Sequence, residues 1–324
     1  MFYQKIILLL FTFIQSIETY TLPYHHWHCI DFVKNIDTTA PYAFNVGDLS
    51  LISWFNKTSS PNTIVNACKH MGVKMNYGRV VDNCLVCPYH KVSHDNKMIF
   101  GKTLTKDDKI WWSYEPDVKS PPDIPFKFDK TFEISMFTIK LDINFKEVIC
   151  DIFDTNNIYN IHKTFIGKTP NNLLLNYKHI NFNNGLVIKY DYNIQNNIKL
   201  FTKDLRSVSV YQTYVYPYTV NNIFRINDKD ILTLNINTLP LSDNKSKLVI
   251  TIKHNFWKSY FQKKNINFLI KRLLNKDINT VSQMHNYNAQ ETHMNIINSM
   301  LKNYTYPDYD SIDKLYNHIR STTY

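Results

Sequence analysis

The chain has 324 residues, of which 44% are hydrophobic and 20% charged, the balance of a folded globular protein. Only 6 glycines occur, and neither a G-x-x-x-x-G-K-[ST] nor a G-x-G-x-x-G motif is present, which argues against mononucleotide- and dinucleotide-binding folds. The 37 basic and 27 acidic residues give a net charge of +10. Because the charge is spread along the chain, it predicts no nucleic-acid partner, only a mild preference for acidic partners or anionic lipid headgroups.

The N-terminus carries an apolar run, residues 6–14, preceded by Lys5. A membrane-spanning helix needs about 20 apolar residues, so this run cannot cross a bilayer unaided. It resembles the apolar core of a secretory signal, but residues 15–18 offer no convincing small-residue cleavage site. For residues 1–22, an interfacial anchor or weak signal-anchor and an ordinary buried segment are equally favoured alternatives, and a cleaved signal is less favoured.

Short strands with alternating and aromatic residues follow, and together they predict an all-β module over residues 23–118. The predicted strands cover residues 49–55, 62–67, 97–100 and 109–114. Residues 120–125, Ser-Pro-Pro-Asp-Ile-Pro, form the best domain linker in the sequence. At roughly 100–200 residues per domain, the remainder, residues 119–324, predicts a second domain.

The five cysteines are too few and too scattered for a disulfide framework. They are Cys29, Cys68, Cys84, Cys87 and Cys150. Three of them lie within 20 residues of one another and among histidines. This clustering indicates metal binding rather than cross-links.

Two short arms carry the metal-binding pattern: Cys68 with His70, and Cys87 with His90, written C-x-H-x16-C-x2-H. Two Cys and two His in paired arms are the ligand set of a Rieske [2Fe–2S] cluster, in which the thiolates hold one iron and the imidazoles the other. A structural zinc site is the alternative, but zinc arms usually pair like ligands, as C-x2–4-C and H-x3–5-H. The mixed arms therefore predict the iron–sulfur cluster.

The block from residue 26 to residue 112 resembles the N-terminal domain of Rieske non-haem iron oxygenases, and residues 87–90 match the family's Cys-Pro-Tyr-His box. The family usually continues with Gly-Trp, where this chain has Lys91 and Val92. Respiratory-type Rieske proteins carry a disulfide between the loops; Val73 and Tyr89 occupy those positions here, which excludes that variant. The absence of this disulfide favours a reducing, intracellular compartment.

Beyond the linker, the pattern predicts an α+β domain whose antiparallel sheet is closed by C-terminal helices, the arrangement of the same family's catalytic domain. A long strand is expected over residues 131–143 and helix-like spacing over 146–165. Further strands are expected over residues 185–192, 207–220, 231–238 and 247–253, and helices over 256–274 and 278–301.

The family's second domain holds a mononuclear Fe(II) with two His and one carboxylate. Its D-x2-H-x4-H motif corresponds here to Asp154, Asn157 and His162, so an amide, a weaker donor, replaces the first histidine. The resemblance implies Asp277 as the third ligand, although an ordinary helix N-cap explains this Asp equally well. In the family, the residue matching Asp154 bridges a cluster histidine of a neighbouring subunit to an iron-ligating histidine.

The resemblance implies an O2-dependent monooxygenase or desaturase that acts on a hydrophobic small molecule, receives electrons from a ferredoxin or reductase, and forms a homotrimer. The family's membrane-linked branches, the sterol 7-desaturases and chlorophyll-breakdown oxygenases, extend the expectation to membrane association through residues 1–22. Because Asn157 stands at a histidine position, the alternative is a degenerate relative that transfers electrons or binds a ligand without mononuclear iron. A bare ferredoxin is disfavoured because roughly 200 residues would have no role.

Overall fold

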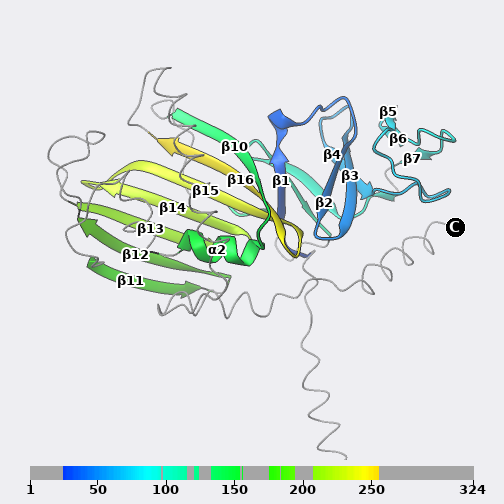
Figure 1. The fold of residues 1–324 in the computed structure, drawn as a ribbon. Helices are drawn as coiled ribbons and strands as arrows, with labels where there is room; N and C mark the ends of the chain where they lie inside the picture. Colours follow the sequence, from blue (N-terminus) through cyan, green and yellow to red (C-terminus); the bar gives the residue numbers. More distant parts are fainter. Residues whose placement is uncertain are drawn as a thin grey trace, which may run out of the picture.

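The computed structural model describes residues 25–95, 98–114, 120–123, 133–153, 155, 175–182, 184–193 and 207–254. Strands dominate this part of the chain (Figure 1). Residues 25–114 form three small antiparallel sheets, and residues 133–254 form one large antiparallel sheet with a helix against it. The predicted fold class, an all-β module followed by an α+β domain with a large antiparallel sheet, is confirmed, while the C-terminal helices expected with that sheet lie outside the described residues.

Each of the three small sheets has three strands. The first contains β1 (His28–Phe32), β9 (Lys109–Ser113) and β8 (Lys102–Lys106) in that order. The second contains β2 (Tyr42–Val46), β3 (Leu49–Phe55) and β4 (Pro61–Val65), and a short 3-10 helix, η2 (Val33–Asn35), precedes it. The third contains β5 (Arg79–Val81), β6 (Cys84–Val86) and β7 (Ser93–His94), and it lies at the end of the molecule farthest from the large sheet (Figure 1).

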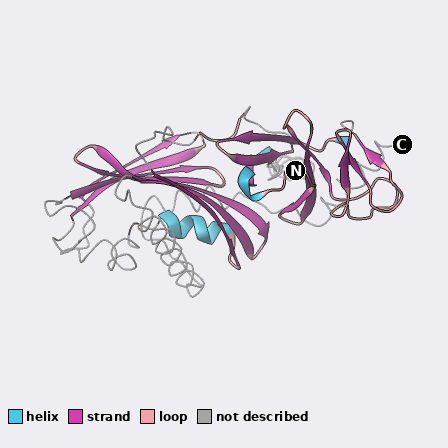
Figure 2. Ribbon diagram, turned by 90° about the horizontal axis from the view of Figure 1, so that it is seen from above, coloured by secondary structure: helices cyan, strands magenta, loops and turns pink. Residues whose placement is uncertain are grey.

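The large sheet has seven strands in the order β10-β16-β15-β14-β13-β12-β11, all antiparallel. The strands are β10 (Glu133–Leu141), β11 (Leu175–Phe182), β12 (Gly185–Asn193), β13 (Ser207–Val215), β14 (Thr219–Ile226), β15 (Lys229–Ser242) and β16 (Lys245–His254). The helix α2 (Phe145–Phe153) lies along one face of the sheet (Figure 2).

The stripe of apolar residues on α2 explains its position. Phe145, Ile149 and Phe153 recur at helical spacing, are all buried, and pack on a core cluster supplied by β12, β13 and β14. On β13 the burial alternates residue by residue, so that Val208, Val210 and Tyr214 face α2. The period of 3.6 on the helix and of 2 on the strands therefore produces one shared core.

Polar contacts between buried side chains join the module to the large sheet. Lys247 of β16 forms a buried ion pair with Asp31 of β1 and donates to the carbonyl oxygen of Ile30 at 3.0 Å. Lys109 of β9, also fully buried, donates to Asn235 of β15. Burying these charges is costly unless they are paired, so the contact specifies how the two parts meet.

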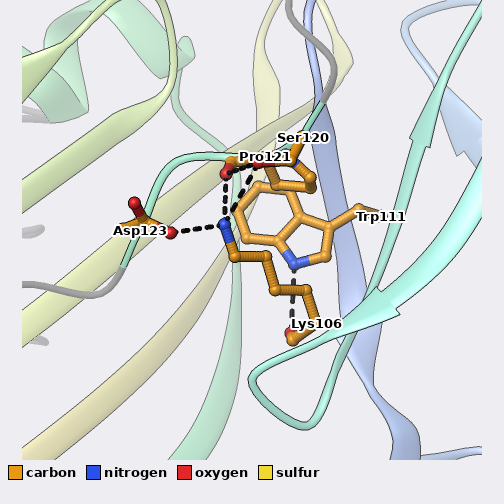
Figure 3. A network of polar contacts seen from close by, with 5 residues as sticks. All are labelled: Lys106, Trp111, Ser120, Pro121 and Asp123. Carbon is orange, nitrogen blue, oxygen red and sulfur yellow. Dashed lines mark hydrogen bonds and ion pairs between the residues drawn. The ribbon is translucent and has the colours of Figure 1, made fainter. Parts of the chain in front are cut away.

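A further contact holds the start of the predicted linker. Lys106 at the end of β8 donates to the carbonyl oxygen of Pro121 and to a carboxylate oxygen of Asp123, both at 2.6 Å, beside the Trp111 ring (Figure 3). Residues 120–123 are therefore bound to the module rather than free of it. The boundary between residues 118 and 119 stays a proposal.

Three expectations about secondary structure need correction or qualification. The single strand expected over 207–220 is wrong: β13 ends at Val215 and β14 starts at Thr219, with a turn containing Pro217 between them. Residues 98–100 are no strand, because the Met98 N–H closes a turn onto the carbonyl oxygen of Asp95. The expected helix over 146–165 is described only as α2, and residues 1–22 and both expected C-terminal helices lie outside the described residues.

Within the described ranges, no helix is long and apolar enough to cross a membrane. The localisation expected from the sequence, intracellular and membrane-associated through residues 1–22, is wrong on this finding. The apolar run at residues 6–14 has about half the length that a spanning helix needs, and it lies outside the described residues.

Candidate metal centre

The two Cys/His arms leave the ends of strands in the part of the module farthest from the large sheet. Cys68 and His70 follow β4, and Cys87 and His90 follow β6. The arms have the same backbone geometry, because the Cys68 N–H donates to the carbonyl oxygen of Val73 at 2.8 Å and the Cys87 N–H to that of Val92 at 2.9 Å. In each arm, a backbone hydrogen bond from the cysteine N–H to the carbonyl oxygen five residues later thus closes a loop that contains the histidine.

Both loops turn through a left-handed residue four positions after the cysteine. In the first arm this is Gly72, with φ of 70°, and in the second it is Lys91, with φ of 59°. Glycine adopts this conformation without strain, whereas a residue with a Cβ is disfavoured by about 1–2 kcal/mol. Lys91 also donates through Nζ to the carbonyl oxygen of Pro88 at 3.0 Å, which partly compensates. The position at which this chain departs from the family's Gly-Trp is therefore a strained one.

The side chain of Asn66 supports the first arm through hydrogen bonds. Its side-chain oxygen accepts from the Met75 N–H at 2.9 Å, and its amide nitrogen donates to Asn76 Oδ1 at 2.7 Å. Asn66 is buried, so these bonds replace those it would make with water. Asn66 was not among the residues predicted from the sequence; its place two residues before Cys68 was the available signal, because Asn side chains often bond nearby backbone in turns.

The four candidate ligands divide into a buried pair and an exposed pair. The side chains of Cys68 and Cys87 are buried, at 3% and 1% exposure, in a core cluster with Trp54 and Leu85. His70 and His90 are exposed. Their Nδ1 atoms lie 3.2 Å apart, with the rings edge to face at 4.9 Å between centroids.

The thiols also face each other. Burial raises the pKa of the Cys68 thiol, and its hydrogen bond with Cys87 raises it further. Burial alone would raise the pKa of Cys87, but the backbone N–H groups of Tyr89 and His90, the Cys68 thiol and the charge of Lys91 together lower it. The second arm is thus the more favourable place for a thiolate.

This geometry fits the chemistry of a [2Fe–2S] cluster bound by two thiolates and two imidazoles. Two nitrogen ligands at about 2.1 Å from one tetrahedral metal ion lie about 3.4 Å apart, close to the Nδ1 separation of 3.2 Å. The described residues contain no group of three or more His, Cys, Asp or Glu side chains that could hold a single ion. A pair of thiols and a pair of imidazoles are the ligands that the two irons of such a cluster require.

The residues expected to hold mononuclear iron lie outside the described ranges. These are Asp154, Asn157, His162 and Asp277. The structure does describe the helix that precedes the first three in sequence, since α2 ends at Phe153. Gln212 of β13 donates through Nε2 to the carbonyl oxygen of Ile152 at 3.1 Å and so anchors the last turn of α2 to the sheet.

Comparison with known proteins gives the same assignment for the module. Residues 26–103 match the model of the Rieske [2Fe-2S] domain. The 3-ketosteroid-9-alpha-monooxygenase oxygenase component of Rhodococcus rhodochrous is 22% identical over 163 residues, which cover 43% of this chain and 41% of that protein. The chain therefore matches less than half the length of this curated relative.

Solved structures extend the likeness to the large sheet. Dicamba monooxygenase bound to 3,6-dichlorosalicylic acid superposes with a TM-score of 0.73 at 13% identity, covering 86% of this chain and 96% of that one. NdmA of Pseudomonas putida with caffeine superposes with a TM-score of 0.66 at 15% identity, covering 86% and 89%. At these identities the likeness concerns the fold alone.

Proposed function

We propose that this chain, which carries a Rieske [2Fe–2S] domain and has the fold of the Rieske oxygenases, is an oxidoreductase that uses O2 to oxidise a hydrophobic small molecule. Its electrons come from a ferredoxin or reductase. The reaction is a hydroxylation, a demethylation or a desaturation.

One observation carries the proposal: two thiols and two imidazoles, from arms 20 residues apart in sequence, face each other in like pairs. When bound there, a [2Fe–2S] cluster supplies single electrons. The protein contributes the rest. Cys68 and Cys87 hold the inner side within an apolar cluster that excludes water, and His70 and His90 hold the outer side at the surface, within reach of a protein partner.

The second part of the proposal concerns residues 154–162, which follow α2 in the sequence, and Asp277; together they would bind Fe(II). Asp154 and His162 keep the family's spacing, and Asn157 offers an amide oxygen in place of an imidazole. The arms lie at the far end of the molecule from the large sheet (Figure 1), which favours pairing of the arms with the sheet of a neighbouring copy. We therefore propose a homotrimer with Asp154 at the contact between copies.

Asn157 favours a second candidate function. If the amide does not hold iron, the protein keeps the cluster without an oxygenase centre and acts in electron transfer or ligand binding. The two candidates differ in metal content, because the oxygenase has about three Fe per chain and the electron carrier about two.

The test is iron and sulfide analysis with EPR on protein purified without oxygen. The reduced protein is expected to show the EPR signal of a Rieske centre and to contain about three Fe per chain. Two Fe per chain would support the electron carrier, and a colourless, zinc-containing protein would contradict both. The matched variant Asn157→His is expected to retain at least as much iron, since imidazole is the stronger donor; a loss of iron would show that Asn157 does not occupy the ligand position.

A further inference from the structure

Two amide side chains lie next to each other on the face of the large sheet that α2 covers. Gln212 of β13 and Asn222 of β14 are direct partners across the strands, so they point to the same side. The residues beside them along β13, Val210 and Tyr214, belong to the core that packs against α2. Gln212 and Asn222 therefore belong to this buried face as well.

Their surroundings are apolar. Ile188 is the partner of Gln212 on one side, and Leu234 is the partner of Asn222 on the other. The exposed fractions of Gln212 and Asn222 are only 3% and 6%. The sheet thus presents two polar groups in the middle of a hydrophobic row.

The hydrogen bonds of these amides are incomplete. Gln212 donates through Nε2 to the carbonyl oxygen of Ile152, and since a carbonyl can only accept, this bond fixes which end of the amide is the oxygen. Among the residues that the structure describes, neither Gln212 Oε1 nor Asn222 Oδ1 has a hydrogen-bond partner. Buried polar groups in native proteins are nearly always bonded, so two adjacent open acceptors require an explanation.

The abundance of asparagine in this chain does not explain these two unpaired acceptors. On the opposite face of the same sheet, three buried asparagines are linked by hydrogen bonds: Asn235 donates to Asn221 at 2.7 Å, and Asn237 donates to Asn235 at 2.8 Å. Lys109 and Thr219 donate to asparagines of this row. In this described row, buried amides with a structural role are hydrogen-bonded.

We propose that Gln212 and Asn222 are the polar part of the substrate site and that the substrate carries a hydrogen-bond donor, a hydroxyl or a ring N–H, on an otherwise apolar body. Two acceptors in an apolar wall select such a molecule, because an analogue that lacks the donor leaves them unpaired. Gln212 also holds the last turn of α2, and α2 ends at Phe153, directly before the sequence segment expected to bind iron. The inference rests on the proposed oxygenase function and adds the substrate class.

The first test needs no ligand. Asn222→Leu keeps the side-chain size and removes an unpaired acceptor, so the cluster-loaded protein is expected to melt roughly 3–6 °C higher. Asn235→Leu is the matched control on the neighbouring strand; it breaks a hydrogen-bonded network and is expected to lower the melting temperature. Destabilisation of both variants by similar amounts would show that Asn222 is a structural amide and would overturn the proposal.

The second test measures recognition with the probe pair 2-naphthol and 2-methoxynaphthalene, which differ in the donor. The wild-type holoprotein is expected to bind 2-naphthol about tenfold more tightly, and Asn222→Leu and Gln212→Met are expected to bind the two probes alike. Equal binding of the two probes by the wild type, including binding of neither, would overturn the proposal. Iron analysis separates the failure of the proposed oxygenase function from the failure of the proposed binding site. If the protein has only about two Fe per chain but still selects the probe with the donor, the oxygenase function is contradicted and the binding site is supported.

Discussion

The two ends of this molecule place chemistry in different ways. At one end, the candidate cluster ligands come from two loops between strands of two to five residues, and an equivalent backbone hydrogen bond closes each ligand arm. At the other, strands of 8 to 14 residues and α2 bury an apolar face in which only a few polar groups remain. The cluster end depends on local spacing and the sheet end on packing between distant segments, so the two should respond to different mutations.

The largest expected effect is at the cluster end. Cys68→Ala removes one of two buried thiols and is expected to abolish the visible absorbance and the EPR signal, because one thiolate cannot hold the iron that two share. The matched control is Cys84→Ala, three residues before Cys87 and only half-buried, which is expected to leave the protein brown. Persistent colour in Cys68→Ala would contradict the ligand assignment.

The junction between the two ends provides the next effect. Lys247→Met leaves the buried carboxylate of Asp31 without its cationic partner, although Asn35 and Tyr42 still donate to it, and is expected to lower the free energy of unfolding by about 3 kcal/mol. The absorbance of the cluster should be retained in the folded fraction. Lys245→Met removes an exposed ion pair with Asp142 at 3.9 Å and is expected to change stability by less than about 1 kcal/mol. Urea unfolding of both variants measures the difference, and equal effects would show that the buried pair does not join the two parts.

The pH dependence of stability tests the same junction. Burial, together with the charge of His26, lowers the pKa of His28 from 6.5 to about 3, and His28 Nε2 lies 3.0 Å from the Tyr218 hydroxyl across the junction. Between pH 6.5 and about 3, His28 binds a proton in the unfolded chain but not in the folded protein. The contribution of neutral His28 to folding stability is therefore complete above pH 6.5 and is lost as the pH falls toward 3.

This loss amounts to about 1.4 kcal/mol per pH unit. In His28→Phe, urea unfolding between pH 7 and 5 is expected to show a shallower decline than in the wild type. His179→Phe, at an exposed site, is the control and should leave the slope unchanged. An unchanged slope in His28→Phe would mean that His28 is not held neutral in the folded protein.

The smallest expected effect is the relief of strain in the second arm. Lys91→Gly removes the Cβ from a left-handed residue and is expected to stabilise the protein by about 1 kcal/mol. Lys91→Ala keeps the Cβ while removing the charge, so it separates the backbone effect from the electrostatic one and should give no gain. Melting temperatures of the cluster-loaded proteins measure both, and equal values for the two variants would show that the backbone conformation carries no strain.

The sequence predicted the module, the candidate ligands and most strands of the large sheet, because these depend on residue types at short, regular spacing. It failed at residues 207–220, where alternation continues on both sides of Pro217 and reads as one strand. It also missed Asn66, whose role depends on Met75 and Asn76 returning to it through a loop.

By itself, then, the sequence determined which donor atoms this protein can offer a metal, since two Cys/His arms of fixed length are a local property. Only the tertiary structure decided that the thiols are buried and the imidazoles exposed, that Lys91 occupies a left-handed position, and that Gln212 and Asn222 meet on the face beneath α2. Those outcomes depend on which segments, far apart in the chain, pack together and exclude water. The spacing of residues along the chain does not determine this packing.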